Sequence, residues 1–232
     1  MNLSVAVTPP YDGEAKLGRA SLIYESVLSG AMSRSYTPKQ DIFCEGDPRR
    51  SVYRVESGAV CLYKCMADGK RQIFDFAFPA DLIGLGASNT HSCGAQAIGP
   101  SQLKAVPLTK LYELASRDPG FALGLYQAVS QELESTRDLL LTIAQLDSLE
   151  RVAIFLLTLS QGNARAGKNP RLLTIPMTRS DIGDLLGTTI ETVSRSLTRL
   201  RQEKLIDIIR GSLIQIIDME GLKALAGQMN YH

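Results

Sequence analysis

Residues 178–201 read Thr-Arg-Ser-Asp-Ile-Gly-Asp-Leu-Leu-Gly-Thr-Thr-Ile-Glu-Thr-Val-Ser-Arg-Ser-Leu-Thr-Arg-Leu-Arg. Apolar residues recur here at helical spacing, in two groups separated by Gly187, which can adopt the positive φ of a tight turn. Gly183 is small enough to let two helices cross near a right angle. The pattern predicts a helix-turn-helix, the second helix of which would enter the major groove of DNA. The two apolar groups are Ile182, Leu185 and Leu186, and then Val193, Leu197 and Leu200.

The second predicted helix carries Glu191, Ser194 and Arg195 on the face away from its apolar residues. Arginine can bind guanine through its fork, glutamate can accept from the amino group of cytosine, and serine can bond either kind of base edge. We therefore predict that these three residues read DNA bases. Further candidates for DNA contact are Thr178, Arg179, Thr188, Thr189, Ile190, Thr192 and Arg199.

A structural role competes with base reading for Glu191. Thr188 precedes it by three residues. The spacing Thr-x-x-Glu is that of a capping box, in which the glutamate hydrogen-bonds the start of its own helix. The sequence leaves both roles open.

The charge distribution favours a nucleic-acid partner. The whole chain of 232 residues has a net charge of only +1. Residues 161–210, however, hold nine Lys or Arg against five Asp or Glu, a net charge of +4, which leaves −3 for the rest. A basic segment around the motif is the electrostatic footprint expected for contact with phosphates.

Membrane association and secretion are not expected. No apolar run approaches the roughly 20 residues that span a bilayer. The first ten residues, Met-Asn-Leu-Ser-Val-Ala-Val-Thr-Pro-Pro, lack the basic start and the sustained apolar core of a signal peptide. We expect a cytoplasmic protein.

The cysteines do not form a metal-binding pattern. No Cys-x-x-Cys pair occurs, and the histidines are His91 and His232. We therefore expect no metal site and no cofactor. We expect the thiols to be small buried side chains. Alternatively, they are redox thiols or ligands of an iron centre; they are Cys44, Cys61, Cys65 and Cys93.

The fold class expected from the whole chain is α+β, beginning with an N-terminal β-roll of the jelly-roll, cyclic-nucleotide-binding-like kind. Residues 1–20 are aperiodic and expected to be flexible, and residues 21–32 are expected to form a short helix. Within the β-roll, 21–117, short β-rich runs alternate with turn signals. The predicted strands are 52–55, 60–65, 72–78 and 103–106.

A long helix is predicted for residues 118–146, with Pro119 in its first turn. Its apolar residues repeat in heptads, which favours a parallel homodimer. The alternative is that this face packs on the β-roll. The residues expected to form the dimer seam are Val129, Leu133, Thr136, Leu140 and Ile143.

A winged helix-turn-helix domain is predicted for residues 147–232. The capping box Asp147–Glu150 begins it, and a hairpin at 205–217 forms the wing. The loop 161–171 is expected to be exposed and to contact either DNA phosphates or RNA polymerase. Its basic residues are Arg165, Lys168 and Arg171.

This order of elements resembles the CRP/FNR superfamily of bacterial transcription regulators, over residues from about 22 to 227. The anchoring motifs are Glu56–Gly58, Phe78–Gly84, Met177–Gly187 and Ile190–Arg195. The FNR and FixK branches read bases through Glu-x-x-Ser-Arg, which Glu191, Ser194 and Arg195 match. The resemblance implies a palindromic operator with TTGAT-like half-sites, a homodimer that activates genes of low-oxygen metabolism, and contact with RNA polymerase.

Two departures narrow the resemblance to a FixK-like regulator. Relatives that bind cyclic AMP hold its phosphate with an arginine in the β-roll, and here no arginine occurs between Arg71 and Arg117. FNR carries iron–sulfur cysteines near its amino terminus, and here residues 1–43 contain none. A smaller departure is Ser196, where relatives tend to place an apolar residue.

Two other functions are weighed against this one. A regulator of the same fold could sense haem, nitric oxide or thiol oxidation through the β-roll. A cupin-like metalloenzyme would need clustered histidine and carboxylate ligands, and the β-roll offers His91 alone. The protein is therefore not expected to be an enzyme.

Overall fold

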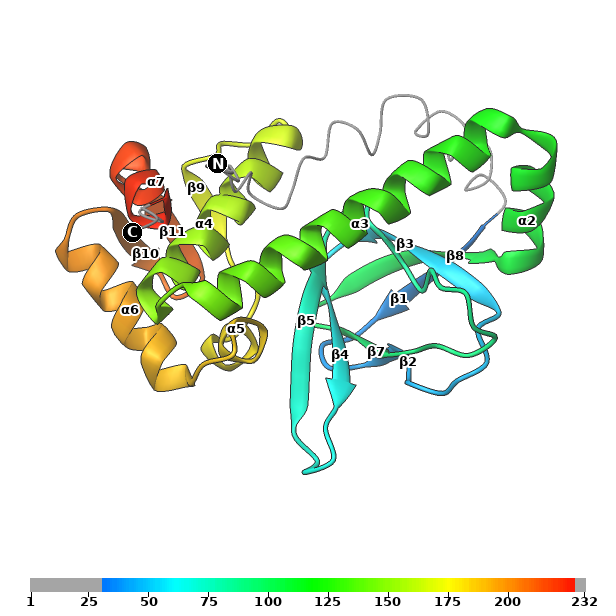
Figure 1. Cartoon of the computed structure of the whole chain (residues 1–232), viewed down its shortest axis with the longest axis horizontal. Helices are drawn as coiled ribbons and strands as arrows, with labels where there is room; N and C mark the ends of the chain where they lie inside the picture. The colour runs from blue at the N-terminus through cyan, green and yellow to red at the C-terminus, as the bar shows by residue number, and fades with distance from the viewer. Residues whose placement is uncertain (1–30, 228–232) are drawn as a thin grey trace, which may run out of the picture. The chain divides into compact units, whose positions relative to one another are not determined.

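The computed structural model describes residues 31–227, so the expected flexible segment 1–20 and nearly all of the expected helix 21–32 lie outside the described residues. The chain divides into two compact units at the boundary between Leu125 and Tyr126. Figure 1 shows the elements of both. Within residues 31–227 no helix combines the length and apolar character that crossing a membrane requires.

The first unit is the expected β-roll, built from two antiparallel sheets of four strands each. One sheet has the order β1-β8-β3-β6 and the other β2-β7-β4-β5. The strands of the first are β1 (Met32–Tyr36), β8 (Ser101–Pro107), β3 (Ser51–Ser57) and β6 (Leu82–Ile83). Those of the second are β2 (Asp41–Phe43), β7 (Gly94–Ala97), β4 (Val60–Cys65) and β5 (Arg71–Ala77).

The predicted strands correspond to β3, β4, β5 and β8, which are the long and strongly apolar ones. The sequence did not indicate β1, whose residues Met-Ser-Arg-Ser-Tyr are exposed except for the last. The remaining three strands were missed because they are only two to four residues long. Their extended form depends on pairing with neighbours, which local sequence does not reveal.

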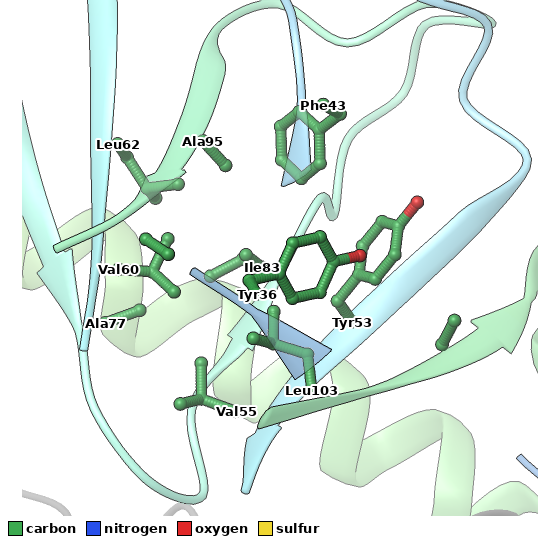
Figure 2. Close-up of a cluster of buried hydrophobic side chains, with 12 residues drawn as sticks. Tyr36, Phe43, Tyr53, Val55, Val60, Leu62, Ala77, Ile83, Ala95 and Leu103 are labelled. Carbon is green, nitrogen blue, oxygen red and sulfur yellow. The ribbon is translucent and has the colours of Figure 1, made fainter. Parts of the chain in front are cut away.

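Side chains from both sheets pack together in one core, and Figure 2 shows them. Val60 and Leu62, two residues apart on β4, both join this core, as side chains on the same face of a strand do. The core members are Tyr36, Phe43, Tyr53, Val55, Val60, Leu62, Ala77, Ile83, Ala95, Ala97, Leu103 and Ala105.

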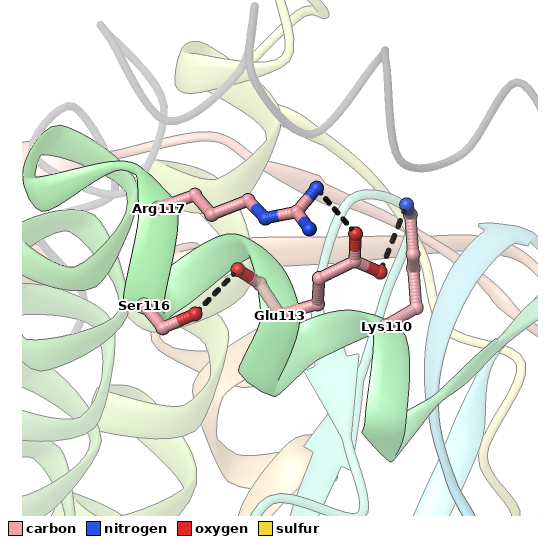
Figure 3. Close-up of polar contacts among 4 residues, drawn as sticks. All are labelled: Lys110, Glu113, Ser116 and Arg117. Atoms are coloured by element: carbon pink, nitrogen blue, oxygen red, sulfur yellow. Dashed lines mark hydrogen bonds and ion pairs between the residues drawn. The ribbon is translucent and has the colours of Figure 1, made fainter.

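Helix α2 (Leu108–Arg117) follows the last strand of the β-roll and was not predicted. Its buried residues Leu108 and Leu111 pack in a second core with Phe121. Its polar side carries a chain of contacts centred on Glu113, shown in Figure 3. The Glu113 carboxylate pairs with Lys110 at 3.2 Å and with Arg117 at 2.7 Å. Such exposed pairs one turn apart each add a few tenths of a kcal/mol.

Helix α3 (Pro119–Gln145) begins one residue after the predicted start and ends one residue before the predicted end. Asp118 caps it, because its Oδ1 accepts hydrogen bonds from the backbone N–H of Gly120 and Phe121. The same residue ends α2 in extended conformation. A single aspartate followed by proline therefore separates the two helices.

The second unit contains the winged helix-turn-helix. The capping box of α4 is present as predicted: Asp147 Oδ1 accepts from Glu150 N at 2.9 Å, and Glu150 Oε2 accepts from Asp147 N at 2.8 Å. The sheet order is β10-β11-β9. The elements are α4 (Ser148–Arg165), β9 (Leu172–Thr174), α5 (Arg179–Leu186), α6 (Ile190–Gln202), β10 (Ile206–Arg210), β11 (Leu213–Ile216) and α7 (Met219–Gly227).

The turn between α5 and α6 depends on two glycines, as the sequence indicated. Gly187 ends α5 in the left-handed region at φ 62°. A Cβ on Gly183 would lie 2.9 Å from the carbonyl oxygen of Thr188, closer than real Cβ contacts come. The two helices can therefore meet only where the first has no side chain.

We predict that Gly183→Ala destabilises the protein by about 1–3 kcal/mol, because the new methyl group would push the Thr188 backbone away. The matched control is Gly162→Ala on α4, where nothing lies within 4 Å of the added Cβ. The control should stabilise the protein by about 0.5–1 kcal/mol through helix propensity. Urea unfolding of both variants measures the difference. If Gly183→Ala were as stable as Gly162→Ala, the Thr188 backbone would be able to move away from the added methyl group without loss of stability.

Candidate nucleic-acid interface

Helix α6 has one buried face and one exposed face. Val193, Leu197 and Leu200 are buried against the rest of the unit. Glu191, Ser194, Arg195 and Arg199 are exposed. The structure thus gathers the three predicted base-reading residues on the solvent side of the helix, within its first two turns, which is the part of a recognition helix that meets base edges.

The alternative role considered for Glu191, a capping box with Thr188, is not formed. The residue that caps α6 is Thr189, whose side chain accepts from Thr192 N at 3.2 Å. The capping box of the motif lies instead at the start of α5, between Thr178 and Asp181. The turn occupies one more residue than the pattern suggested, so Glu191 stands at the second position of its helix.

The Glu191 carboxylate is held in its ionised form. Hydrogen bonds from its own backbone amide and from the Thr189 hydroxyl lower its pKa, and Arg195 lowers it further. An ionised carboxylate only accepts hydrogen bonds. Glu191 therefore suits a donor such as the amino group of cytosine.

The other two predicted base-reading residues make only contacts within the helix. The Ser194 hydroxyl donates to the Ile190 carbonyl at 2.8 Å, which leaves it able to accept. Arg195 Nη2 donates to Thr192 Oγ1 at 3.2 Å. Arg199 is paired with Glu203 at 2.8 Å. These contacts are exposed, so exchanging them for DNA groups costs little.

The further DNA-contact candidates lie at the start of α5, in the turn and on α6, and they differ in exposure. Ile190 is 47% exposed at the start of α6. Arg179 is half-buried at the first residue of α5, and burial lowers its pKa. Thr178 and Thr189 serve as helix caps, whereas Thr188 and Thr192 lie half-buried in the turn and the first turn of α6.

Ser196, the unusual polar residue of α6, is buried at 6% exposure. Its hydroxyl donates to the Ser148 carbonyl at 3.4 Å, at the start of α4. The bond provides the partner that a buried hydroxyl requires. The departure from an apolar residue is thus compensated by a contact between α6 and α4.

The predicted loop 161–171 begins later than expected, because α4 continues to Arg165. The side chain of Arg165 lies outside the described residues. Lys168 is exposed. Arg171 has a structural role that the sequence did not indicate, since its Nη1 donates to the Ile217 carbonyl at 2.9 Å beside the wing.

The predicted dimer seam on α3 is largely exposed. Val129 is 51% exposed, Leu133 50% and Leu140 63%, and Thr136 is also exposed. Ile143 is half-buried and approaches the Gly187 turn. Large apolar side chains thus repeat along one exposed side of this helix.

In the β-roll, an arginine side chain from outside the loop after β6 binds that loop, which the local sequence did not indicate. Arg49 is 8% exposed, and its Nε donates to the Ser88 carbonyl at 2.6 Å. Its Nη2 lies 3.5 Å from the Tyr112 hydroxyl of α2. Although the sequence has no arginine between residues 71 and 117, the fold brings the Arg49 guanidinium to this loop. That guanidinium is already hydrogen-bonded to the loop.

His91 closes the same loop as a core residue. It is 5% exposed and stacks on Phe43 with ring centroids 3.7 Å apart. Burial and the nearby Arg49 guanidinium lower its pKa. A neutral, stacked imidazole is a packing element here. No group of three or more His, Cys, Asp or Glu among residues 31–227 is arranged to hold a metal ion.

The expectation of buried thiols is wrong for two of the four cysteines. Cys61 is buried and donates to the Gln96 carbonyl at 3.5 Å, and Cys93 is half-buried. Cys44 and Cys65 are exposed. Partial desolvation and the carboxylates of Asp41 and Asp47 raise the pKa of Cys44, so less of it is thiolate at a given pH.

Comparison with known proteins gives the family. Residues 150–225 match the Crp-like helix-turn-helix domain, and residues 33–118 match the cyclic nucleotide-binding domain. The transcriptional activatory protein AadR of Rhodopseudomonas palustris is 35% identical over 82% of this chain and 80% of its own length. The fumarate and nitrate reduction regulatory protein of Escherichia coli is 33% identical over 81% of this chain and 76% of its own.

A solved structure agrees over nearly its whole length. FixK2 from Bradyrhizobium japonicum is 34% identical, covers 84% of this chain and 96% of its own, and superposes with a TM-score of 0.79. The proteins matched are regulators rather than enzymes. The two-sheet β-roll, the helix-turn-helix and these relatives together place the chain in the CRP/FNR family of transcription regulators with a DNA-binding helix-turn-helix, in its FixK-like branch.

Proposed function

We propose that the protein is a homodimeric activator that reads a TTGAT-like inverted repeat and controls genes of low-oxygen metabolism without cyclic AMP. The observation that carries this proposal is the exposed face of α6, where Glu191, Ser194 and Arg195 stand together while the opposite face is buried. These residues match the Glu-x-x-Ser-Arg pattern with which FNR and FixK regulators read DNA.

The three side chains supply complementary hydrogen-bonding groups. Arg195 can donate two parallel bonds to a guanine, and the ionised Glu191 can accept from a cytosine amino group. Ser194 can donate or accept. Thr178 and Arg179, at the start of α5, would contact phosphates, which fix the register of a protein on DNA without specifying sequence.

The oxygen-related role and activation rest on relatives. The Pasteurella multocida relative is called an anaerobic regulatory protein, and AadR is called a transcriptional activatory protein. RNA polymerase is the second partner that activation requires. Lys168, exposed beyond the end of α4, is the best placed of the predicted polymerase contacts, because Arg171 is bonded to the wing.

The apolar surface of α3 supports dimerisation. Leaving Val129, Leu133 and Leu140 at half exposure or more is unfavourable for a chain alone in water. Pairing two such helices buries these residues in heptad register. A dimer also presents two recognition helices, as an inverted repeat requires.

The loop after β6 supports independence from cyclic AMP. The buried Arg49 guanidinium bonds the Ser88 carbonyl, and His91 is stacked in the core. Residues 82–100 themselves contain no arginine or lysine. A cyclic phosphate would have to displace an existing bond to gain a charged partner, and a buried anion without one is unfavourable.

Arg195→Ala should weaken operator binding by about 1–3 kcal/mol and relax the preference for one guanine in each half-site. The reason is the loss of a forked contact to a base edge. Titration of the variant against operators carrying every single-base change measures both effects. Arg117→Ala, an exposed arginine on α2, is the control and should bind as the wild type does. Undiminished discrimination in Arg195→Ala would contradict its assignment.

The double variant Leu133→Asp, Leu140→Asp should be a monomer and lose palindrome affinity, because charges facing each other in the seam repel and stay solvated. Sedimentation velocity gives the mass, and operator titration gives the affinity. Met66→Asp places the same charge on another exposed apolar residue, 54% exposed in the β4–β5 turn, and should stay dimeric. A double variant that remains a dimer would move the interface elsewhere.

Cyclic AMP at millimolar concentration should leave operator affinity unchanged. A ligand shifts a conformational equilibrium only through different affinities for its states. Calorimetry of the nucleotide with the protein and operator titration with and without it test this. A tenfold gain in operator affinity, about 1.4 kcal/mol, would contradict it. That result would mean that Arg49 leaves Ser88 to bind the phosphate.

A further inference from the structure

One arginine joins the end of the long helix to the helix-turn-helix. Arg151 lies in the first turn of α4. Its Nε donates to the Leu146 carbonyl at 2.9 Å, and its Nη1 donates to the Leu186 carbonyl at 2.9 Å. Leu146 is the residue directly after α3, and Leu186 is the last residue of α5. A single side chain therefore connects three helices.

The chemistry of this contact is specific to arginine. Carbonyls at helix C-termini lack intrahelical partners and carry partial negative charge, so they attract a cation. The guanidinium is planar and presents its donors at fixed angles, which fixes the direction from one carbonyl to the other. A lysine offers a point charge on a flexible stem and imposes no such direction.

Neighbouring distances place the end of α3 beside the turn of the motif. A Cβ on Gly187 would lie 3.7 Å from Ile143 Cγ2 of α3 and 3.8 Å from Arg151 Nη1. The Ser196 hydroxyl binds the Ser148 carbonyl, which attaches α6 to the same first turn of α4. Both helices of the motif are thus held at the place where α3 ends.

We propose that Arg151 is a positioning residue that sets the direction of α6 relative to α3, and with it the half-site spacing that the dimer accepts. The proposal rests on the proposed function, because it requires two copies paired through α3. In such a dimer the direction of α6 fixes the separation of the two recognition helices. Half-sites one helical turn apart require a separation of about 34–36 Å.

The test compares full-length wild type, Arg151→Met and Arg151→Lys on a series of duplexes. Each carries two TTGAT half-sites, and the spacer between them changes by one base pair at a time. A further duplex carries a single half-site. Lys223→Met, which removes an exposed ion pair on α7, is the control. Fluorescence anisotropy gives the affinity for each duplex.

The wild type and the control should prefer one spacing. Arg151→Met should bind that spacing about tenfold more weakly and bind neighbouring spacings almost equally well, because its recognition helices are no longer held at one separation. Its affinity for the single half-site should change by less than about threefold, since the base-reading face is intact. Arg151→Lys should lose the preference in part.

The outcomes separate the two proposals. Equal losses on the palindrome and the single half-site would overturn the positioning role, because Arg151 would then support only the fold of the motif. A spacing profile unchanged from the wild type would overturn it as well. A wild type without any spacing preference would overturn the dimeric operator and this role together. If Arg151→Met shows no cooperative melting, Arg151→Lys decides by the same comparison, because it keeps the charge and loses the fork.

Discussion

The close approach of the Thr188 carbonyl to Gly183 is the contact on which the arrangement of the interface depends. With no side chain at Gly183, the turn that starts α6 lies directly against α5. That approach fixes where α6 begins and how it crosses α5. The crossing in turn decides which residues of α6 face inward, and these are Val193, Leu197 and Leu200. The face left outward carries Glu191, Ser194 and Arg195, for which we propose base reading.

The same turn connects the motif to the rest of its unit. Gly187 adopts a left-handed conformation, so the carbonyl of Leu186 remains available at the end of α5. Arg151 uses that carbonyl, and its other donor binds the carbonyl of Leu146 after α3. Backbone carbonyls at two helix ends are thus bound by one side chain next to the motif. Side-chain identity matters there chiefly at the arginine and the glycines.

In the β-roll, two residues far apart in the sequence, Arg49 and Ser88, make a contact that the sequence did not predict. The segment after β6 contains no arginine or lysine, and the sequence predicts that it lacks a cation. The fold nevertheless brings Arg49 from before β3 against Ser88, where it is buried and hydrogen-bonded. The loop is thereby bonded to the protein's own guanidinium. The domain keeps the architecture of a cyclic nucleotide-binding domain, while the groups around this loop are already engaged with each other.

Sequence by itself determined the long strands, the start of α3 and the two helices of the motif, because periodic apolar residues and capping residues act locally. It also placed Glu191, Ser194 and Arg195 on one face, since helical spacing alone fixes which residues share a side. Tertiary structure decided what depends on distant partners. It paired the short strands β2, β6 and β7, moved the cap of α6 to Thr189, and engaged Arg171 with the wing. Tertiary structure alone brought Arg49 to the Ser88 carbonyl and Arg151 to the carbonyls at two helix ends. The carbonyls that are left without a backbone partner, and the side chains beside them, are determined only once the chain has folded.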